Sequence, residues 1–313
     1  MSQLLHLTNS RDTLVCEQQL FDTSTQEPVV ISTQRTLCIA LLGIALFVPA
    51  LLADDAKRDA PYKSPYSVKF THTLKELVGD LDGPRGDPHL QSDVPFRDWN
   101  TDAARKKFDT WGPPQRHYPE PDGIANKPRD WKQQRVIAVA LRFQGYNYQH
   151  HHIPDWVPQE NAPGKKGVVG HNAKGVDCSN FTTFVYNLGF GIKPNSDVHK
   201  QSEERGFALP GEKRLHRVEV INKPETYKGF VDTLQTGDLL YIRNTEGHIA
   251  HVVIWVGSIG QPDKVPLIID SHGDGVKDSE GNQIPKGIHL RPFGEKSWYH
   301  HSASHALRVF TEK

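Results

Sequence analysis

The hydrophobic pattern of the C-terminal half predicts one helix followed by several strands. Four apolar residues between positions 181 and 188 recur at helical spacing, Asp177 is a suitable N-cap before Cys178, and Gly189 is expected to end the helix. Apolar and β-branched runs that predict strands follow at residues 239–243, 252–256, 267–269, 287–293 and 306–310. A helix followed by consecutive strands that can pair antiparallel indicates an α+β fold.

One of these strands is expected at the centre of the sheet. Residues 252–256 are apolar on both faces, which is typical of a strand that is buried on both sides. His251 stands at the entrance of this strand, and Asp270 and His272 follow the next apolar run. Because Asp270 and His272 are two positions apart, we expect them on the same face of their strand.

An apolar run near the N-terminus has the pattern of a signal peptide. Residues 37–53 are apolar, a cation precedes them, and the small residue Ala53 comes before a polar stretch. The run is short for a bilayer span and contains Pro49, although an uncleaved membrane anchor is the alternative interpretation. We therefore expect residues 1–53 to be a leader, and the mature chain to be exported to the periplasm or the extracellular space.

The charge composition argues against nucleic acid or an anionic membrane as a binding partner. The 313 residues include 37 basic and 37 acidic side chains, so no net charge attracts nucleic acid or an anionic membrane. We therefore expect no nucleic-acid partner. Gly (25) and Pro (22) are plentiful and hydrophobic residues make up only 36%, which indicates a loop-rich globular protein rather than a helical bundle.

Cys178 is the only cysteine that follows the apolar leader. An exported chain meets an oxidising compartment in which cysteines usually pair, so a lone thiol is either buried and inert or retained for chemistry. At the first turn of the predicted helix, unsatisfied amides and the helix dipole favour the thiolate, and the same amides can hold an oxyanion. Cys178 is therefore a candidate nucleophile, with His251 as a candidate base.

These residues resemble the NlpC-type cysteine peptidases, papain-like enzymes that cut bacterial cell-wall peptides. The family's motif Asp-Cys-Ser-Gly-Phe is matched at residues 177–181, except that Asn180 replaces the glycine. The family's Gly-Asp-Leu is matched at residues 237–239, and its His-Val-Gly-Ile-Tyr-hydrophobic-Gly at residues 251–257. The resemblance extends from about residue 131 to the C-terminus, where these motifs occur in the family's order.

An upstream part of the chain is also similar to the family. Residues 135–143 and 145–148 echo the family's helix and the Gly-x-Pro-Tyr that follows it, with Asn147 in place of the proline. The resemblance implies a papain-like α+β domain over residues 131–313, in which N-terminal helices pack on a central antiparallel sheet.

The resemblance also implies the roles of the candidate residues. Cys178 is then the nucleophile and His251 the base, and Asp270 holds the position of the third polar residue, which is usually a histidine in the family. His272 is the alternative for that third position. A carboxylate is a good partner for the imidazole nitrogen that faces away from the cysteine. Five residues are predicted to contact the substrate: Tyr148, His150, Asp177, Ser179 and His272.

The implied activity is hydrolysis of an amide bond in a peptidoglycan stem peptide through a thioester on the cysteine, without a cofactor. The alternatives are a papain-like amidase or acyltransferase that acts on another substrate, and a catalytically inactive wall-binding module. The intact set of cysteine, histidine and aspartate argues against the inactive module. We expect a secreted monomer whose partner is the peptidoglycan peptide, with no stable membrane span after the leader is cleaved.

Residues 54–130 give fewer structural signals. Prolines recur throughout, and only residues 71–78 have a helical pattern. We interpret residues 54–130 as an extension that packs across the catalytic domain, with a small wall-binding domain as the alternative.

A metal site is the rival interpretation of the histidines. Residues 150–152 are three consecutive histidines, but no metal-ligand spacing such as His-Glu-x-x-His occurs in the chain. Adjacent histidines on an extended chain also point to opposite faces. We therefore predict no metal ligands, and we interpret residues 150–152 as part of the cleft wall or as a solvated loop.

Overall fold

The computed structural model describes residues 62–158, 173–211, 215–257, 259–261, 265–273 and 275–311. The predicted leader, residues 1–53 with its apolar run 37–53, lies outside the described residues. Within the described ranges, no helix is both long enough and apolar enough to cross a membrane.

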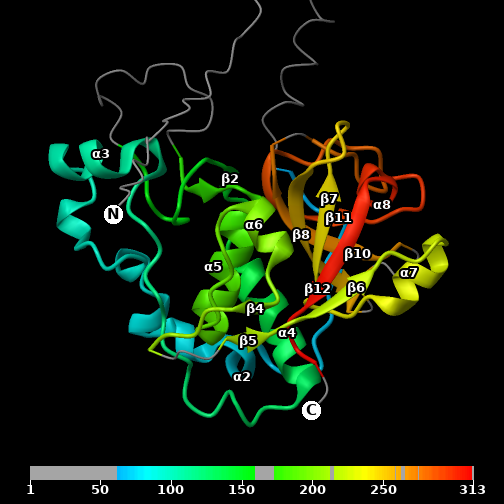
Figure 1. Ribbon diagram of the computed structural model, residues 1–313, viewed down its shortest axis with the longest axis horizontal. Coiled ribbons are helices and arrows are strands. Elements are labelled where there is room, and N and C mark those ends of the chain that lie inside the picture. Colours follow the sequence, from blue (N-terminus) through cyan, green and yellow to red (C-terminus); the bar gives the residue numbers. More distant parts are fainter. Residues whose placement is uncertain are drawn as a thin grey trace, which may run out of the picture. The chain divides into compact units, whose positions relative to one another are not determined.

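A six-stranded antiparallel sheet forms the centre of the described chain (Figure 1). Its strand order is β11-β10-β8-β7-β12-β6, and each neighbouring pair runs antiparallel. The strands are β6 (Glu219–Asn222), β7 (Leu239–Arg243), β8 (Ile249–Gly257), β10 (Leu267–His272), β11 (Gly287–Pro292) and β12 (Ala303–Arg308). The predicted α+β fold with a central antiparallel sheet is confirmed.

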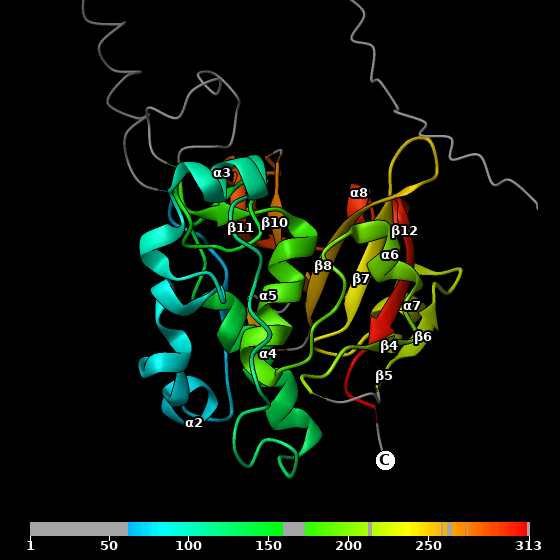
Figure 2. The same ribbon diagram turned by 60° about the vertical axis from the view of Figure 1, so that its left-hand side comes forward.

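Side chains of the sheet alternate between two hydrophobic cores, one on each face. In β8 the even-numbered residues of 252–256 belong to one core and the odd-numbered residues to the other. The first core includes α4 (Arg129–Leu141) and α5 (Cys178–Phe190), and α7 (Tyr227–Thr233) and α8 (Trp298–His301) contribute to the second. Figures 1 and 2 show α4 and α5 together on one side of the sheet. Because a hydrophobic core covers each face of the sheet, β8 is buried on both faces, as predicted.

Helix α5 begins where the sequence predicts and ends later. The carboxylate of Asp177 accepts a hydrogen bond from the Asn180 backbone N–H at 2.8 Å, which is the predicted N-cap. The predicted end at Gly189 is wrong, because the helix continues to Phe190 and Gly191 adopts the left-handed conformation with φ of 69°. A left-handed glycine just past the last turn is the usual way to end a helix.

Two strands also differ from their predicted bounds. β8 begins at Ile249, so His251 lies inside the strand rather than at its entrance, and Asp270 likewise lies inside β10. Ile242 pairs with His251 whereas Arg243 pairs with Ile249, so Ala250 is an extra residue that forms a bulge. Such bulges re-aim neighbouring side chains, here beside His251.

The segment 62–130 holds more helix than predicted. The predicted helix is present as α2 (Leu74–Val78), preceded by a capping box between Thr73 and Glu76. A second helix, α3 (Asp102–Phe108), is capped by Thr101 and was missed because its charged residues show no apolar periodicity. The described residues belong to one compact unit, and the boundary at residue 131 stays a prediction.

Short elements complete the described chain. The 3-10 helices are η1 (Gly79–Asp82), η2 (Pro84–Gly86), η3 (Pro88–Leu90), η4 (Phe96–Asp98) and η5 (Asp109–Trp111). The remaining helix is α6 (Val198–Glu203), and the two-residue strands are β1 (Ser67–Val68), β2 (Asn147–Tyr148), β3 (Gly175–Val176), β4 (Gly206–Phe207), β5 (His216–Arg217) and β9 (Gly260–Gln261). Strand β2 pairs in parallel with β3, which leads directly into α5.

Candidate active site

Cys178 is the first residue of α5 and is a free, buried cysteine with 5% of its surface exposed. Asp177, the N-cap of α5, directly precedes it in the chain. The side chain of Cys178 forms a hydrogen bond with the side chain of His251 in β8. The Sγ atom of Cys178 therefore lies at the helix N-terminus and contacts the imidazole of His251. The helix dipole favours a negative charge at this position.

His251 also contacts Asp270, which lies on the neighbouring strand β10. The Nε2 atom of His251 lies 2.7 Å from Oδ2 of Asp270, and the side chains are 7% and 0% exposed. The expected contact between Asp270 and the imidazole is therefore present, and Nδ1 is the ring nitrogen that remains for Cys178. The structure brings the three predicted residues together in the order Cys178, His251, Asp270, and their catalytic roles stay a prediction.

The electrostatics of this group favour a charged pair. Burial opposes protonation of His251, but the negative charge of Cys178 and the hydrogen bonds to Asp270 and Cys178 outweigh it and raise the pKa of His251 to about 10. Burial also favours the neutral form of Asp270, yet the charge of Arg291 and the hydrogen bond from His251 hold the pKa of this carboxyl well below its usual range. His251 is therefore held as an imidazolium beside the ionised carboxylate of Asp270.

Two residues that hold Asp270 were missed by the sequence analysis. Nε of Arg291 donates to Oδ1 of Asp270 at 2.7 Å, with both side chains 0% exposed, and the Tyr299 hydroxyl donates to Oδ2 at 2.9 Å. In the β10–β11 register Arg291 pairs with Ile268, so it lies diagonally across from Asp270. The sequence does contain a signal for Arg291, because an arginine within the apolar run 287–293 is expected to be buried and to require a partner of opposite charge.

His272, the alternative third residue, takes a different place. Its ring lies edge-on to His251 with 4.9 Å between the ring centroids, whereas Nε2 of His251 bonds Asp270. The indole of Trp298, from α8, lies 5.8 Å from the His251 ring and 5.7 Å from the His272 ring. Trp298 is 41% exposed, so it forms part of the rim of the site, and the sequence analysis did not single it out.

Tyr148 and His150 form another part of the surroundings. Tyr148 is half-buried, and its ring lies against Gly273, where an added Cβ would be 3.5 Å from the ring carbon Cδ1. His150 is exposed, meets the Tyr148 ring edge-on at 5.5 Å, and stacks on Trp111 at 5.3 Å. The segment 62–130 thus contributes Trp111 to the aromatic cluster that holds His150. Substrate contact by Tyr148 and His150 stays a prediction.

Asp177 and Ser179 are both engaged within the protein. The buried Asp177 carboxylate accepts from the Asn180 backbone N–H, from Nδ2 of Asn180 at 3.0 Å, and from the Ser179 hydroxyl at 3.2 Å. The Ser179 hydroxyl also lies 2.7 Å from the carbonyl oxygen of Ser196. Asn180, which replaces the family's glycine, therefore adds a donor to the helix cap. Substrate contact by Asp177 and Ser179 stays a prediction.

The three consecutive histidines have different surroundings. His150 is exposed, whereas His151 is fully buried and packs edge-on against Trp156 at 4.5 Å. His152 stacks on Trp111 at 5.5 Å, and its Nδ1 lies 2.9 Å from the carbonyl oxygen of Gly112. Among the residues that the structure describes, no group of three or more His, Cys, Asp and Glu side chains is arranged to hold a metal ion.

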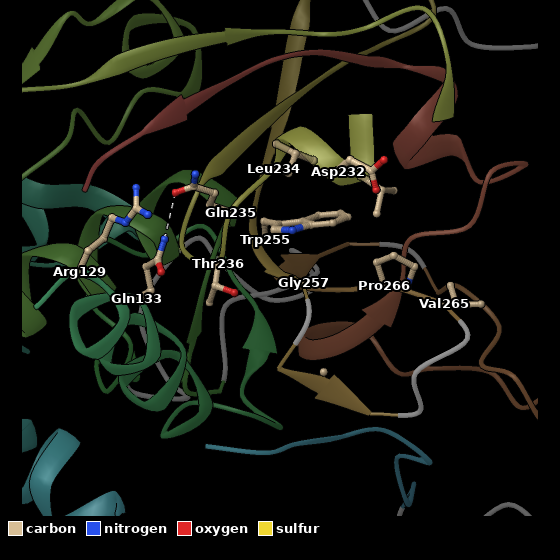
Figure 3. A pocket seen from close by; sticks show the side chains of 12 residues that line it. Arg129, Gln133, Asp232, Leu234, Gln235, Thr236, Trp255, Gly257, Val265 and Pro266 are labelled. Carbon is tan, nitrogen blue, oxygen red and sulfur yellow. Dashed lines mark hydrogen bonds between the residues drawn. The ribbon is translucent and has the colours of Figure 1, made fainter. Parts of the chain in front are cut away.

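A cavity of about 710 Å³ lies apart from the candidate site (Figure 3). Gln133 of α4 and Gln235 face each other at its edge, joined by a hydrogen bond of 3.3 Å, and Trp255 and Gly257 of β8 also line it. Trp255 is four residues beyond His251, which is roughly 13 Å along an extended strand. Cys178, His251 and Asp270 are not among its lining residues.

Three solved structures are similar to part of the chain. An NlpC/P60 family protein from Bacillus cereus ATCC 10987 is 19% identical, with 56% of this chain and 40% of that chain covered and a TM-score of 0.33. NlpC1 from Trichomonas vaginalis is 14% identical, with 57% and 45% covered and a TM-score of 0.30. The NlpC/p60 domain of peptidoglycan hydrolase SagA is 18% identical, with 56% and 97% covered and a TM-score of 0.29.

The chain spans less than half the length of the Bacillus and Trichomonas proteins. No curated protein matches the chain significantly. The NlpC/P60 family model matches residues 165–306, a range that contains Cys178, His251 and Asp270. This match confirms the NlpC-type resemblance that the sequence motifs predicted for this part of the chain.

Proposed function

We propose that the protein is a cysteine peptidase or amidase that hydrolyses an amide bond of a peptidoglycan stem peptide. The observation that carries the proposal is the contact series from Cys178 through His251 to the buried Asp270, at the N-terminus of a helix. The NlpC/P60 match over residues 165–306 supports a cell-wall peptide as the substrate class. The leader pattern of residues 1–53 supports action in the periplasm or outside the cell.

The first step forms a thioester. The thiolate of Cys178 attacks the carbonyl carbon, a bond forms between carbon and Sγ, and the oxyanion is held by amides at the start of α5. His251 then donates its proton to the amide nitrogen, the carbon–nitrogen bond breaks, and the amine leaves. Asp270 keeps the imidazole in place and stabilises its positive charge through both half-reactions.

The second step releases the acid. His251, now neutral, accepts a proton from a water molecule, and the hydroxide attacks the thioester carbon. The carbon–sulfur bond breaks, the carboxylic acid leaves, and the thiolate of Cys178 is restored beside protonated His251. Every proton in this scheme passes through His251, which is consistent with its contacts to both Cys178 and Asp270.

Digestion of purified peptidoglycan tests the proposal. The wild-type protein should release fragments with a new free amine and a new carboxyl group in the stem peptide, identified by mass spectrometry. Cys178→Ala should release none while retaining the wild-type circular dichroism spectrum, because the removed side chain lies at a helix start. Unchanged peptidoglycan after incubation with the wild type would contradict the proposed substrate, and an active Cys178→Ala variant would contradict the mechanism.

A further inference from the structure

The short helix α8 contributes two adjacent side chains to the candidate site. Tyr299 is 1% exposed and its hydroxyl donates to Asp270 at 2.9 Å, whereas Trp298 is 41% exposed. The Trp298 ring meets both histidines of the site, His251 at 5.8 Å and His272 at 5.7 Å between ring centroids. An indole that touches the imidazole of the base and remains open to solvent is available to a substrate.

The proposed hydrolysis determines which part of a substrate lies beside Trp298. During amide hydrolysis the acyl part becomes bonded to Sγ of Cys178, and the amine part must take its proton from His251. The leaving amine therefore lies nearer to His251 and to the aromatic groups around it than the acyl part does. Among these groups, Trp298 offers the larger apolar surface, and His272 beside it offers a polar edge.

We propose that Trp298 is a specificity-determining residue that packs against the aliphatic side chain of the residue released as the amine. The inference rests on the proposed amide hydrolysis at Cys178. Tyr299 anchors α8 to Asp270, so the position of Trp298 is coupled to the same carboxylate that orients His251. A leaving residue with a long alkyl side chain buries apolar surface on the indole, and glycine in the same place buries none.

Two synthetic stem peptides that share their acyl part test this inference. One releases norleucine, which has a linear alkyl side chain, and the other releases glycine. Trp298→Ala should lower kcat/KM for the norleucine substrate roughly tenfold more than for the glycine substrate, because the lost contact is apolar. Trp298→Phe keeps an aromatic face and should lose less of this preference.

Phe96→Ala provides the matched control. Phe96 is also an exposed aromatic residue, at 48%, and stacks on an imidazole, that of His89, with 3.7 Å between the ring centroids. Its removal should leave the ratio of the two kcat/KM values unchanged. An equal loss on both substrates in Trp298→Ala overturns the inference and leaves the proposed function standing. A wild type that cleaves neither peptide overturns both.

Discussion

The buried pair of Arg291 and Asp270 leads to a stability prediction with a defined pH dependence. Arg291→Met keeps most of the side-chain volume and removes the guanidinium that lies 2.7 Å from Asp270. Asp270 is 0% exposed, so water cannot replace the lost partner. Among the residues that the structure describes, His251 and Tyr299 are the side chains that continue to donate to it. The variant should therefore be much less stable than the wild type at neutral pH.

The size of the loss follows from the burial of both partners. Removing one member of a fully buried ion pair costs about 3 to 5 kcal/mol, because the other charge is left without compensation. For a domain of this size that loss corresponds to a decrease of roughly 6 to 20 °C in Tm. Thermal unfolding followed by circular dichroism measures it directly.

The pH dependence has a definite sign. In the wild type the pKa of Asp270 is lowered, so its contribution to stability is present above the unfolded value of about 3.9 and is lost as pH falls through the folded value. Without Arg291 the pKa of Asp270 rises, and the variant relieves its buried charge by taking up a proton at a higher pH. The difference in Tm between the two proteins should therefore be largest near pH 7 and shrink below about pH 4.

Arg135→Met is the control for this experiment. Arg135 is also buried, at 2% exposure, but its partner Asp80 is 38% exposed and can be hydrated when the guanidinium, 2.7 Å away, is removed. This variant should show a loss of stability that changes little between pH 4 and pH 7. A loss in Arg291→Met that is equally independent of pH would refute the electrostatic argument. It would assign the effect to packing and to the lost hydrogen bonds from Arg291 to the carbonyl oxygens of Pro285 and Gly287.

Three further predictions concern the base and its partner. His251→Ala should abolish turnover whereas the exposed His248→Ala should retain it, and equal losses would contradict the assignment. The stability that protonated His251 contributes should be present below its unfolded pKa of about 6.5 and lost as pH rises through the folded pKa of about 10, which scans of Tm against pH would measure. Asp270→Ala should lower kcat strongly and Asp270→Asn should recover part of it, because the amide still positions the imidazole; wild-type kcat in both variants would rule out an orienting role.

Much of the candidate site was accessible from local sequence patterns. Apolar spacing and the Asp177 cap placed Cys178 at the start of α5, because helix caps depend on residues only a few positions apart. The run of apolar residues on both faces similarly identified β8 as a central strand. The predicted helix end at Gly189 failed because the choice between two nearby glycines depends on what the chain packs against, and Gly191 lies against the backbone of Glu120.

The partners of Asp270 depended on the tertiary structure. The apolar run 287–293 contains a signal that Arg291 is a buried charge, which the sequence analysis did not use, and periodicity identifies the face of a strand and not the strand beside it. Only the pairing of β10 with β8 and β11 brings His251 and Arg291 to the same carboxylate. Tyr299 reaches this carboxylate from α8, 29 positions later in the chain, and the neighbouring Trp298 reaches the His251 ring. No local sequence pattern links either residue to the site. Contacts between residues far apart in sequence form only when the strands and helices of the domain have assembled. They are therefore properties of the fold rather than of any segment.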